Sequence, residues 1–173
     1  KIKETRYYYD NLQLGSVGLG NQTKEESWIS GGNYASSQKT YNSFGLVIQS
    51  KDPNGNATNF AYDSYNLYPA AITNALNQAT QFAYNYANGK PTQITDANGN
   101  VFKNTYDGFG RIIKTEQPNQ TNPAISVIKT LYVYTDTAGA VSTRQTDFLD
   151  FSIFVSSYNY YDGLGRTIQT KKS

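Results

Sequence analysis

A tyrosine-led phrase recurs along this chain and constrains its fold more than any other feature. Tyr-Asp-Gly-Phe-Gly-Arg at 106–111 returns as Tyr-Asp-Gly-Leu-Gly-Arg at 161–166. Counted from Tyr62 through Tyr84 to Tyr106, the period is about 22 residues, which lies in the range of repeat architectures. Repeats of this size bury their surfaces against their neighbours. A residue that returns in each unit is therefore interpreted first as a structural part.

The composition removes several classes of function. The 173 residues carry a formal net charge of +2, so the chain has no electrostatic footprint for nucleic acid. There is no cysteine and no histidine, which excludes disulfides and removes the commonest general base and metal ligand. No apolar run approaches the ~20 residues of a membrane helix. Tyrosine favours strands and glycine favours turns, and with 16 and 14 copies they indicate β-structure with many turns.

A second phrase, rich in asparagine and glycine, keeps the same period. Asp-Pro-Asn-Gly-Asn at 52–56 and Asp-Ala-Asn-Gly-Asn at 96–100 contain the Asn-Gly pair, the strongest short-range hairpin signal. We predict tight hairpin turns with positive φ at these two pairs, which are Asn54, Gly55, Asn98 and Gly99. Each unit is then an antiparallel β-hairpin, joined to the next by the turn after its tyrosine. The predicted fold class is all-β, built from tandem hairpin repeats.

Isoleucine keeps the register of the repeat. Ile48, Ile113 and Ile168 each follow the leading tyrosine of their unit by seven residues. Because side chains alternate between the faces of a strand, fixed offsets place one aliphatic side chain per strand on a common face. We expect tyrosines and isoleucines to be buried along this face, and the tyrosines of successive hairpins to line up.

The regularity of the repeat varies along the chain. We expect a divergent region at 1–40, regular repeats at 41–115, an irregular strand-rich insertion at 116–160, and the start of a further repeat at 161–173. Within the insertion, 125–134 and 147–160 are predicted to be long strands because they are rich in aromatic and β-branched residues. The chain has no methionine, and its last unit stops after about half a period, so we expect a piece of a longer chain.

These phrases resemble the YD repeat of Rhs proteins, whose relatives occur in the C component of insecticidal Tc toxins and in teneurins. The resemblance rests on Tyr-Asp-Gly-(Phe/Leu)-Gly-Arg with its isoleucine, and on Asp-x-Asn-Gly-Asn with its closing tyrosine. The expected structural repeat signature is Tyr41, Tyr62, Tyr84, Tyr106, Asp107, Gly108, Gly110, Arg111, Tyr161, Asp162, Gly163, Gly165 and Arg166. The pattern departs at Leu46, Asn66 and Lys90, where the arginine is missing.

The resemblance implies a curved strip of hairpins that forms a section of a hollow β-shell. In bacterial members the shell encloses a toxic C-terminal domain, and in teneurins it is a rigid extracellular body. The implied partners are further YD repeats of the same longer polypeptide and an enclosed C-terminal domain, with no nucleic acid and no membrane span. The resemblance also implies a secreted or cell-surface location and no cofactor.

Other kinds of site are weaker interpretations of the same residues. Asp107 and Asp162 lack an acid or histidine in step with them, so a turn role is favoured over catalysis. Asp-x-Asn-x-Asn at 52–56 superficially matches the start of a calcium loop, but its glycine is at position 4 instead of position 6. The arginines of the repeat could hold an anionic partner, although pairing with carboxylates is favoured.

Two classes of function stay open, and an enzyme is not predicted. The first is a structural section of a β-shell that encapsulates or scaffolds a toxin or effector domain. The second is a cell-surface adhesin that stacks glycans on exposed tyrosines. The first predicts tyrosines buried along one face, and the second predicts several tyrosines in an exposed groove. The solvent accessibility of Tyr62, Tyr84, Tyr106 and Tyr161 separates them.

Overall fold

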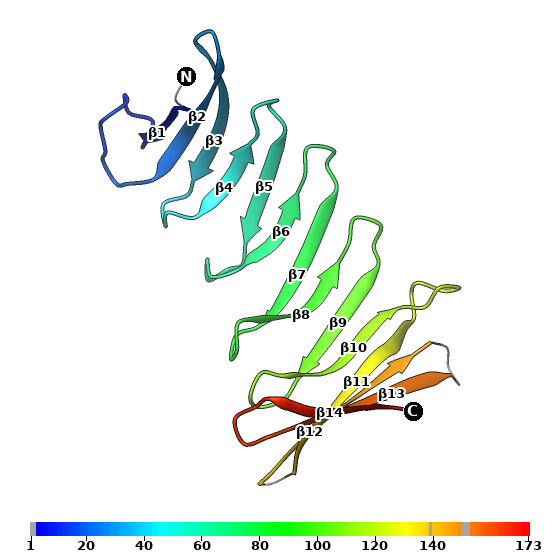
Figure 1. Cartoon of the computed structure of the whole chain (residues 1–173). Coiled ribbons are helices and arrows are strands. Elements are labelled where there is room, and N and C mark those ends of the chain that lie inside the picture. Colours follow the sequence, from blue (N-terminus) through cyan, green and yellow to red (C-terminus); the bar gives the residue numbers. More distant parts are fainter. Residues whose placement is uncertain (1–2, 139, 150–152) are drawn as a thin grey trace. The chain divides into compact units, whose positions relative to one another are not determined.

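The computed structural model describes residues 3–138, 140–149 and 153–173, and these residues form strands, turns and no helix. Fourteen strands lie in one antiparallel sheet in sequence order, from β1 to β14 (Figure 1). The predicted all-β class of tandem antiparallel hairpins is thereby confirmed. Among the described residues there is no helix with the length and hydropathy of a membrane span.

The chain divides into two compact units, 1–81 and 82–173, whose border falls inside β7. The strands up to that border are β1 (Thr5–Tyr9), β2 (Gln22–Ser30), β3 (Asn33–Tyr41), β4 (Val47–Lys51), β5 (Ala57–Tyr62), β6 (Pro69–Thr73) and β7 (Ala79–Asn85). The strands beyond it are β8 (Lys90–Thr95), β9 (Val101–Tyr106), β10 (Ile112–Pro118), β11 (Ser126–Thr137), β12 (Ala140–Phe148), β13 (Phe154–Tyr161) and β14 (Thr167–Lys172).

One turn design joins many of the consecutive strands. Between β4 and β5, the amide of Gly55 donates to the carbonyl of Asp52 at 3.0 Å, and the amide of Asp52 donates to the carbonyl of Asn56 at 3.0 Å. This is a three-residue hairpin loop, in which a type I turn is followed by a left-handed residue. The same pair of hydrogen bonds recurs at 42–46, 74–78, 96–100, 107–111 and 162–166.

The left-handed residue in these loops is the fourth of the five. Gly55 has φ of 86° and Gly99 has φ of 82°, whereas neither Asn54 nor Asn98 has a positive φ. The positive φ expected for both residues of each Asn-Gly pair thus belongs to the glycine alone. The reason is the type I turn, which holds its two central residues at negative φ and needs a left-handed residue only after them.

The strand register gathers aromatic and aliphatic side chains on one face. Phe60 in β5 is paired with Ile72 in β6, and Ile94 in β8 is paired with Phe102 in β9. Because alternate residues of a strand share a face, Tyr62 lies on the same side of the sheet as Phe60. The opposite face of β5 is small or polar.

That second face is represented by two neighbouring pairs in the first unit. Ala61 is paired with Ala71. Gln49 is paired with Asn59, and its side-chain amide donates to the Asn59 side-chain oxygen at 2.8 Å. The strands β5 and β6 therefore have one aromatic–aliphatic face and one face of small or polar residues.

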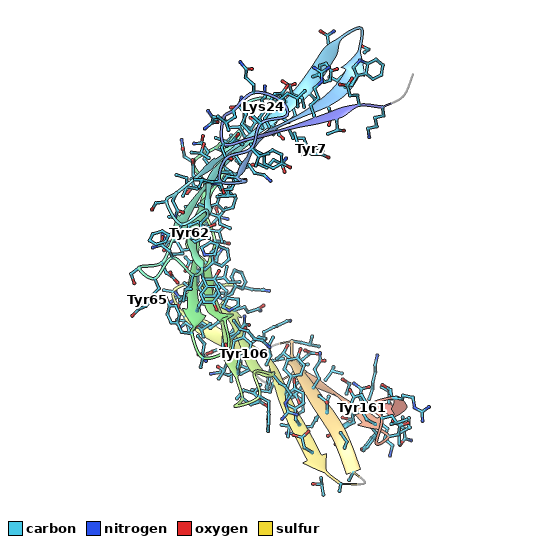
Figure 2. The ribbon with its side chains drawn as sticks, turned by 90° about the vertical axis from the view of Figure 1, so that its left-hand side faces the viewer. Tyr7, Lys24, Tyr62, Tyr65, Tyr106 and Tyr161 are labelled. Carbon is cyan, nitrogen blue, oxygen red and sulfur yellow. The ribbon has the colours of Figure 1, made fainter. Side chains whose placement is uncertain are left out.

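Neither face is covered by a second layer within the first unit, where side chains stand on both sides of the ribbon (Figure 2). No hydrophobic residue is buried among those the structure describes. Ile72, Ile94 and Ile113 are half-buried, but Ile48 is 36% exposed and Ile168 is 67% exposed. The expectation of a buried isoleucine row is therefore wrong, because only lateral neighbours cover a side chain on a single-layered sheet.

The segment 116–160 continues the antiparallel order and has longer strands. β11 has 12 residues, and β12 pairs with it over eight positions from Thr130–Asp147 to Thr137–Ala140. The expected long strand at 147–160 is wrong, since β12 ends at Phe148 and β13 begins at Phe154. Part of that expectation, 150–152, lies outside the described residues. The sequence-based division into four regions stays a prediction.

Candidate functional site

The aspartates of the tyrosine-led turns bind their own loops. Asp107 accepts hydrogen bonds from the amides of Phe109 and Arg111 on one oxygen, both at 2.9 Å, and from Nε of Arg111 on the other at 2.7 Å. Asp162 does the same with the amides of Leu164 and Arg166 at 2.9 Å and with Nε of Arg166 at 2.6 Å. Both carboxylates are thus occupied by the turn that contains them.

The asparagine-rich turns have the same construction at the other ends of the strands. Asp52 accepts from the amides of Asn54 and Asn56 at 2.9 Å and from the Asn56 side-chain amide at 2.8 Å. Asp96 repeats these bonds with Asn98 and Asn100. The tyrosine-led and the asparagine-rich phrases therefore form the same structural motif, which closes hairpins at both ends of the strands.

These contacts change the acidity of the turn carboxylates. The Asn56 side-chain amide, followed by the backbone amides of the loop, holds the pKa of Asp52 below its usual value. The Arg166 backbone amide and guanidinium lower the pKa of Asp162. Burial pushes the pKa of Asp107 upward, but the amide and guanidinium of Arg111 outweigh it and leave that pKa lowered. A carboxylate held ionised in this way suits a structural role and not that of a general acid.

Two tyrosines that precede a turn in the regular repeats form a hydrogen bond with the backbone of a neighbouring strand. The hydroxyl of Tyr62 at the end of β5 donates to the carbonyl of Val47 at the start of β4, at 3.1 Å. Tyr106 in β9 donates to the carbonyl of Pro91 in β8 at 2.8 Å. Each of these bonds connects the two strands of one hairpin, whose tight turn lies at the opposite end.

Two further tyrosines make the same kind of hydrogen bond, one at the start of the regular repeats and one in the segment 116–160. Tyr41 donates to the carbonyl of Gln22 at 2.7 Å, and Tyr134 in β11 donates to the carbonyl of Ile112 in β10 at 2.9 Å. Tyr134 was not singled out from the sequence, because the loop before β11 shifts it out of the period. No spacing shared with the other tyrosines that make this bond marks Tyr134 in the sequence.

Solvent accessibility of four tyrosines was expected to distinguish the shell from the adhesin. All four are half-buried, namely Tyr62, Tyr84, Tyr106 and Tyr161. Tyr84 stacks on Phe82 of its own strand, with ring centroids 6.3 Å apart and an interplanar angle of 29°. The expectation that equivalent tyrosines line up on neighbouring strands is wrong, because Tyr62, Tyr84 and Tyr106 lie on β5, β7 and β9. The equivalent tyrosines are two strands apart, roughly 10 Å, which is too far for direct ring packing between them.

Arg111 connects its turn to β11. Its two terminal nitrogens donate to the two carboxylate oxygens of Asp136 at 2.9 and 2.8 Å, a bidentate ion pair. Its guanidinium carbon also lies 4.2 Å from the ring centroid of Tyr134. The two carboxylates bonded to Arg111, Asp136 first and Asp107 second, raise the pKa of the guanidinium. Arg111 is therefore a cross-strand clamp between its turn and β11.

Lys90 occupies the position of this arginine in the turn between β7 and β8. Its ammonium donates to the carbonyl of Gly110 and lies 5.5 Å from the ring centroid of Tyr106. Lys90 departs from the sequence pattern, but it keeps the contact between a cation and a tyrosine ring. Leu46 and Asn66 have no charge with which to make it.

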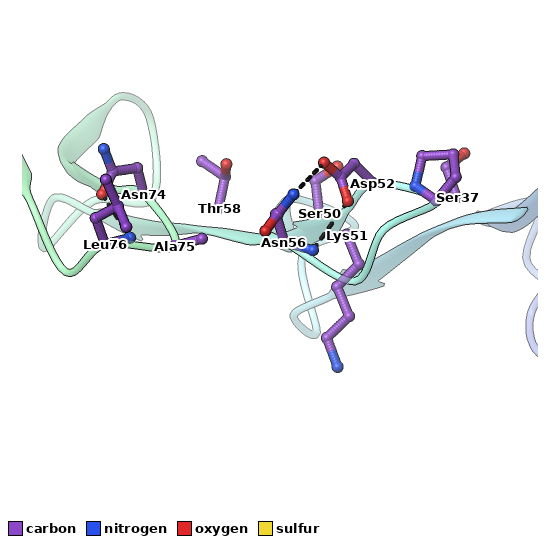
Figure 3. Close-up of a pocket in the computed structure, with 10 residues that line it drawn as sticks. Ser37, Ser50, Lys51, Asp52, Asn56, Thr58, Asn74, Ala75 and Leu76 are labelled. Atoms are coloured by element: carbon purple, nitrogen blue, oxygen red, sulfur yellow. Dashed lines mark hydrogen bonds between the residues drawn. The ribbon is translucent and has the colours of Figure 1, made fainter.

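A shallow depression with polar and apolar lining lies beside the loops that close β4–β5 and β6–β7. Its volume is about 640 Å³, and Figure 3 shows that its lining includes Asp52, Asn56 and Asn74, with Asp52 and Asn56 bonded to each other. The oxygens of Asp52 are thus directed to its own loop. Among the described residues, no group of three or more acidic side chains could hold a metal ion.

With this geometry in place, the family can be identified. The family model for the teneurin YD-shell matches residues 4–153, which is most of the chain. The chain belongs to the teneurin YD-shell family. The match includes 116–153, where the resemblance in sequence is poor, and there the YD-shell chain keeps the antiparallel strand order. No curated protein matches the chain.

Solved structures with the same fold are Tc toxin assemblies. A structure of TcdB2-TccC3-Cdc42 is similar with a TM-score of 0.66 and 16% identity, covering 90% of this chain and 9% of that chain. TcdB2-TccC3-TEV is similar with a TM-score of 0.57 and 14% identity, covering 91% and 11%. The Photorhabdus luminescens Tc holotoxin pore is similar with a TM-score of 0.51 and 13% identity, covering 89% of this chain and 10% of that chain. At these identities the likeness is one of fold, and this YD-shell chain spans about a tenth of those chains.

Proposed function

We propose that this chain is a section of the wall of a YD-shell that encloses or scaffolds a toxin or effector domain. Its partners are then the further repeats of its own longer polypeptide and the enclosed domain. Its work is mechanical, with no catalytic step, and its location is outside the cell that makes it. Membership of a shell family and the fold of the Tc toxin assemblies support this proposal.

One observation carries the proposal. The polar groups that recur with the repeat are directed to the chain itself: the carboxylates of Asp52 and Asp107 bind their own loops, and the hydroxyls of Tyr62 and Tyr106 bind neighbouring backbone. A wall needs such internal bonds because its single layer buries no hydrophobic core among the described residues. An enzyme or a lectin would direct at least part of a recurrent polar set outward.

The glycan-binding alternative is not favoured by the same contacts. A sugar-stacking platform needs open aromatic faces, but cationic side chains lie over several of the rings. The ammonium of Lys24 is 3.9 Å from the ring centroid of Tyr8, and the guanidinium of Arg6 is 4.2 Å from that of Tyr34. Together with the clamp on Tyr134, these contacts support a structural use of the tyrosines.

The test uses the full-length polypeptide that contains this chain, treated with a broad-specificity protease and analysed by mass spectrometry. If the wall encloses a domain, that domain resists cleavage in the parent polypeptide and becomes sensitive when Gly55 and Gly99 are both changed to valine. Gly108→Ala, at a position without positive φ, serves as the matched control and leaves protection unchanged.

Two outcomes would reject the proposal. Equal cleavage of the downstream domain in the parent and in the double variant would show that this section encloses nothing. Saturable binding of the 173-residue chain to one glycan on an array, lost when Tyr62 is changed to alanine, would favour the adhesin instead.

A further inference from the structure

Asparagine is followed directly by glycine at three places in the chain, at 54–55, 88–89 and 98–99. The first and third pairs lie in five-residue hairpin loops, and the second lies in the turn between β7 and β8. In such a pair the amide nitrogen of the glycine can reach the side-chain carbonyl carbon of the asparagine, because glycine has no Cβ to obstruct the approach. The surroundings of each pair decide whether the two groups react in the folded chain.

The asparagines of the two hairpin loops have free side chains. Asn54 and Asn98 are exposed, and each donates a backbone hydrogen bond while its side-chain amide makes none within the described residues. A Cβ built on Gly55 or Gly99 would meet no atom within 4 Å. The side-chain amide can therefore turn towards the next residue without losing a contact or displacing a neighbour.

One hydrogen bond holds the glycine amide of each of these loops. The amide of Gly55 donates to the carbonyl of Asp52, and that of Gly99 donates to the carbonyl of Asp96, both at 3.0 Å. The nitrogen is available for reaction only when this bond opens. β4 and β5 pair over three positions, and so do β8 and β9, so each loop closes a short ladder. Exposed loops at the ends of short ladders open at a low cost in free energy.

The third pair is held more firmly. Asn88 is half-buried, and its side-chain oxygen accepts a hydrogen bond from the amide of Lys90 at 3.1 Å. Its Cβ and Nδ2 lie 3.7 Å from the place that a Cβ on Gly110 would occupy, so the side chain packs beside the neighbouring turn. The amide of Gly89 donates to the carbonyl of Asn85 at 2.8 Å. A reaction at this pair therefore breaks two hydrogen bonds and a packing contact, whereas each of the other pairs breaks one hydrogen bond.

We propose that Asn54 and Asn98 are sites of spontaneous deamidation in the folded chain, and that Asn88 is protected from it. The glycine amide nitrogen gives up its proton to hydroxide and forms a bond to Cγ of the asparagine, whose amide group takes up a proton from water and leaves as ammonia. Water then opens the resulting succinimide ring at either carbonyl, which leaves an aspartate or an isoaspartate. This inference goes beyond the proposed function, because it depends on the two loops whether or not the wall encloses a domain.

The isoaspartate product should weaken the hairpin that carries it. Its backbone runs through the former side chain and is longer by one methylene group. In the β4–β5 loop, the hydrogen bonds from Gly55 to Asp52 and from Asp52 to Asn56 fix the distances across the five residues. The longer backbone should not keep both bonds of this type I design. The aspartate product has a normal backbone and should leave the loop closed.

The test follows the three asparagines in the complete 173-residue chain. The folded protein is incubated at mildly alkaline pH, sampled over time, digested, and analysed by mass spectrometry with electron-transfer fragmentation, which distinguishes isoaspartate from aspartate. We expect Asn54 and Asn98 to convert to both products, and Asn88 to convert about fivefold more slowly or less, the factor that one further hydrogen bond of average strength supplies. In concentrated urea the difference between the three should disappear.

Asn77 is the matched control within the same chain. It is exposed, it lies in the loop 74–78 of the same design, and that loop closes β6 and β7, which also pair over three positions. Its next residue is Gln78, whose side chain obstructs the attack, so Asn77 should stay intact under conditions that convert Asn54.

Two variants separate the modification from other effects of ageing. The double variant Asn54→Gln with Asn98→Gln, at positions without positive φ, should keep its melting temperature during the incubation, whereas that of the parent chain should fall. Asn54→Asp should melt closer to the fresh parent than to the aged one, because it has a normal backbone. Equal loss of Asn54 and Asn88 in the folded chain, loss of Asn77, conversion only in urea, or a difference that persists in urea would overturn the proposal.

Discussion

Replacing Gly55 by alanine isolates the energetic contribution of the left-handed position in the hairpin loop. Gly55 has φ of 86°, and a Cβ built on it meets no atom within 4 Å, so the substitution introduces no steric clash with other residues. What remains is the intrinsic cost of a left-handed non-glycine residue, about 1–2 kcal/mol. Alanine also restricts the unfolded chain, which offsets part of that cost by about 0.4–1 kcal/mol.

Gly108→Ala provides the matched control for this substitution. Gly108 occupies the second position of the same loop design, it has no positive φ, and its Cβ would also meet nothing within 4 Å. The effect on the unfolded chain is then the same in both variants. The difference between the two free energies of unfolding should therefore equal the left-handed penalty of about 1–2 kcal/mol.

The assay is thermal unfolding monitored by circular dichroism. For a chain of this size, 1 kcal/mol corresponds to about 2–4 °C in melting temperature, so Gly55→Ala should melt about 2–8 °C below Gly108→Ala. Gly55→Asn should lose less, because asparagine occupies the equivalent place at Asn66 and Asn77 with φ of 54° and 60°. Equal melting temperatures for the two alanine variants would refute the assignment of this loop design.

Three further outcomes are expected. Arg111→Lys and Asp136→Asn should each lower the melting temperature, because neither variant can make the bidentate pair, and the double variant should lose less than the sum of the two. Additive losses in this double-mutant cycle would contradict the clamp. Tyr84→Ala should cost about 2 kcal/mol more than Tyr7→Ala in urea unfolding, since Tyr84 is half-buried and Tyr7 is 47% exposed, and equal midpoints would count against the packing argument. Because the pKa of Asp107 is lowered in the folded state, the unfolded state takes up a proton on this carboxylate at a higher pH, and the free energy of unfolding should decrease as the pH drops below about 4. Asp107→Asn should make that decrease smaller. An unchanged dependence of unfolding on acid pH would exclude the contribution.

The sequence predicted the hairpin plan well because the information for it is local. A five-residue loop such as 52–56 contains all of its determinants: an aspartate to accept the amides, a proline at the second position and a glycine at the left-handed one. The equivalence of this loop with 107–111 was missed, since their sequences share only the first and fourth residues of the five.

The cross-strand contacts were harder to predict because they depend on register. Asp136 lies 25 residues after Arg111, across a loop of irregular length, so no fixed spacing marks the pair. Lys90 was taken as a departure from the pattern although its charge keeps the contact with Tyr106. The burial of isoleucine was overestimated because period-two alternation indicates a shared face and not whether another layer covers it.

The pairing of every strand with its neighbours in sequence has a consequence for how the chain folds. All-β proteins usually fold slowly because distant segments must find one another, but here most hairpins close a loop of a few residues, with a small loss of entropy. A chain emerging from the ribosome could add one strand at a time to the growing edge without waiting for a distant partner. The same order allows the sheet to come apart from an end one hairpin at a time under tension, instead of in a single event.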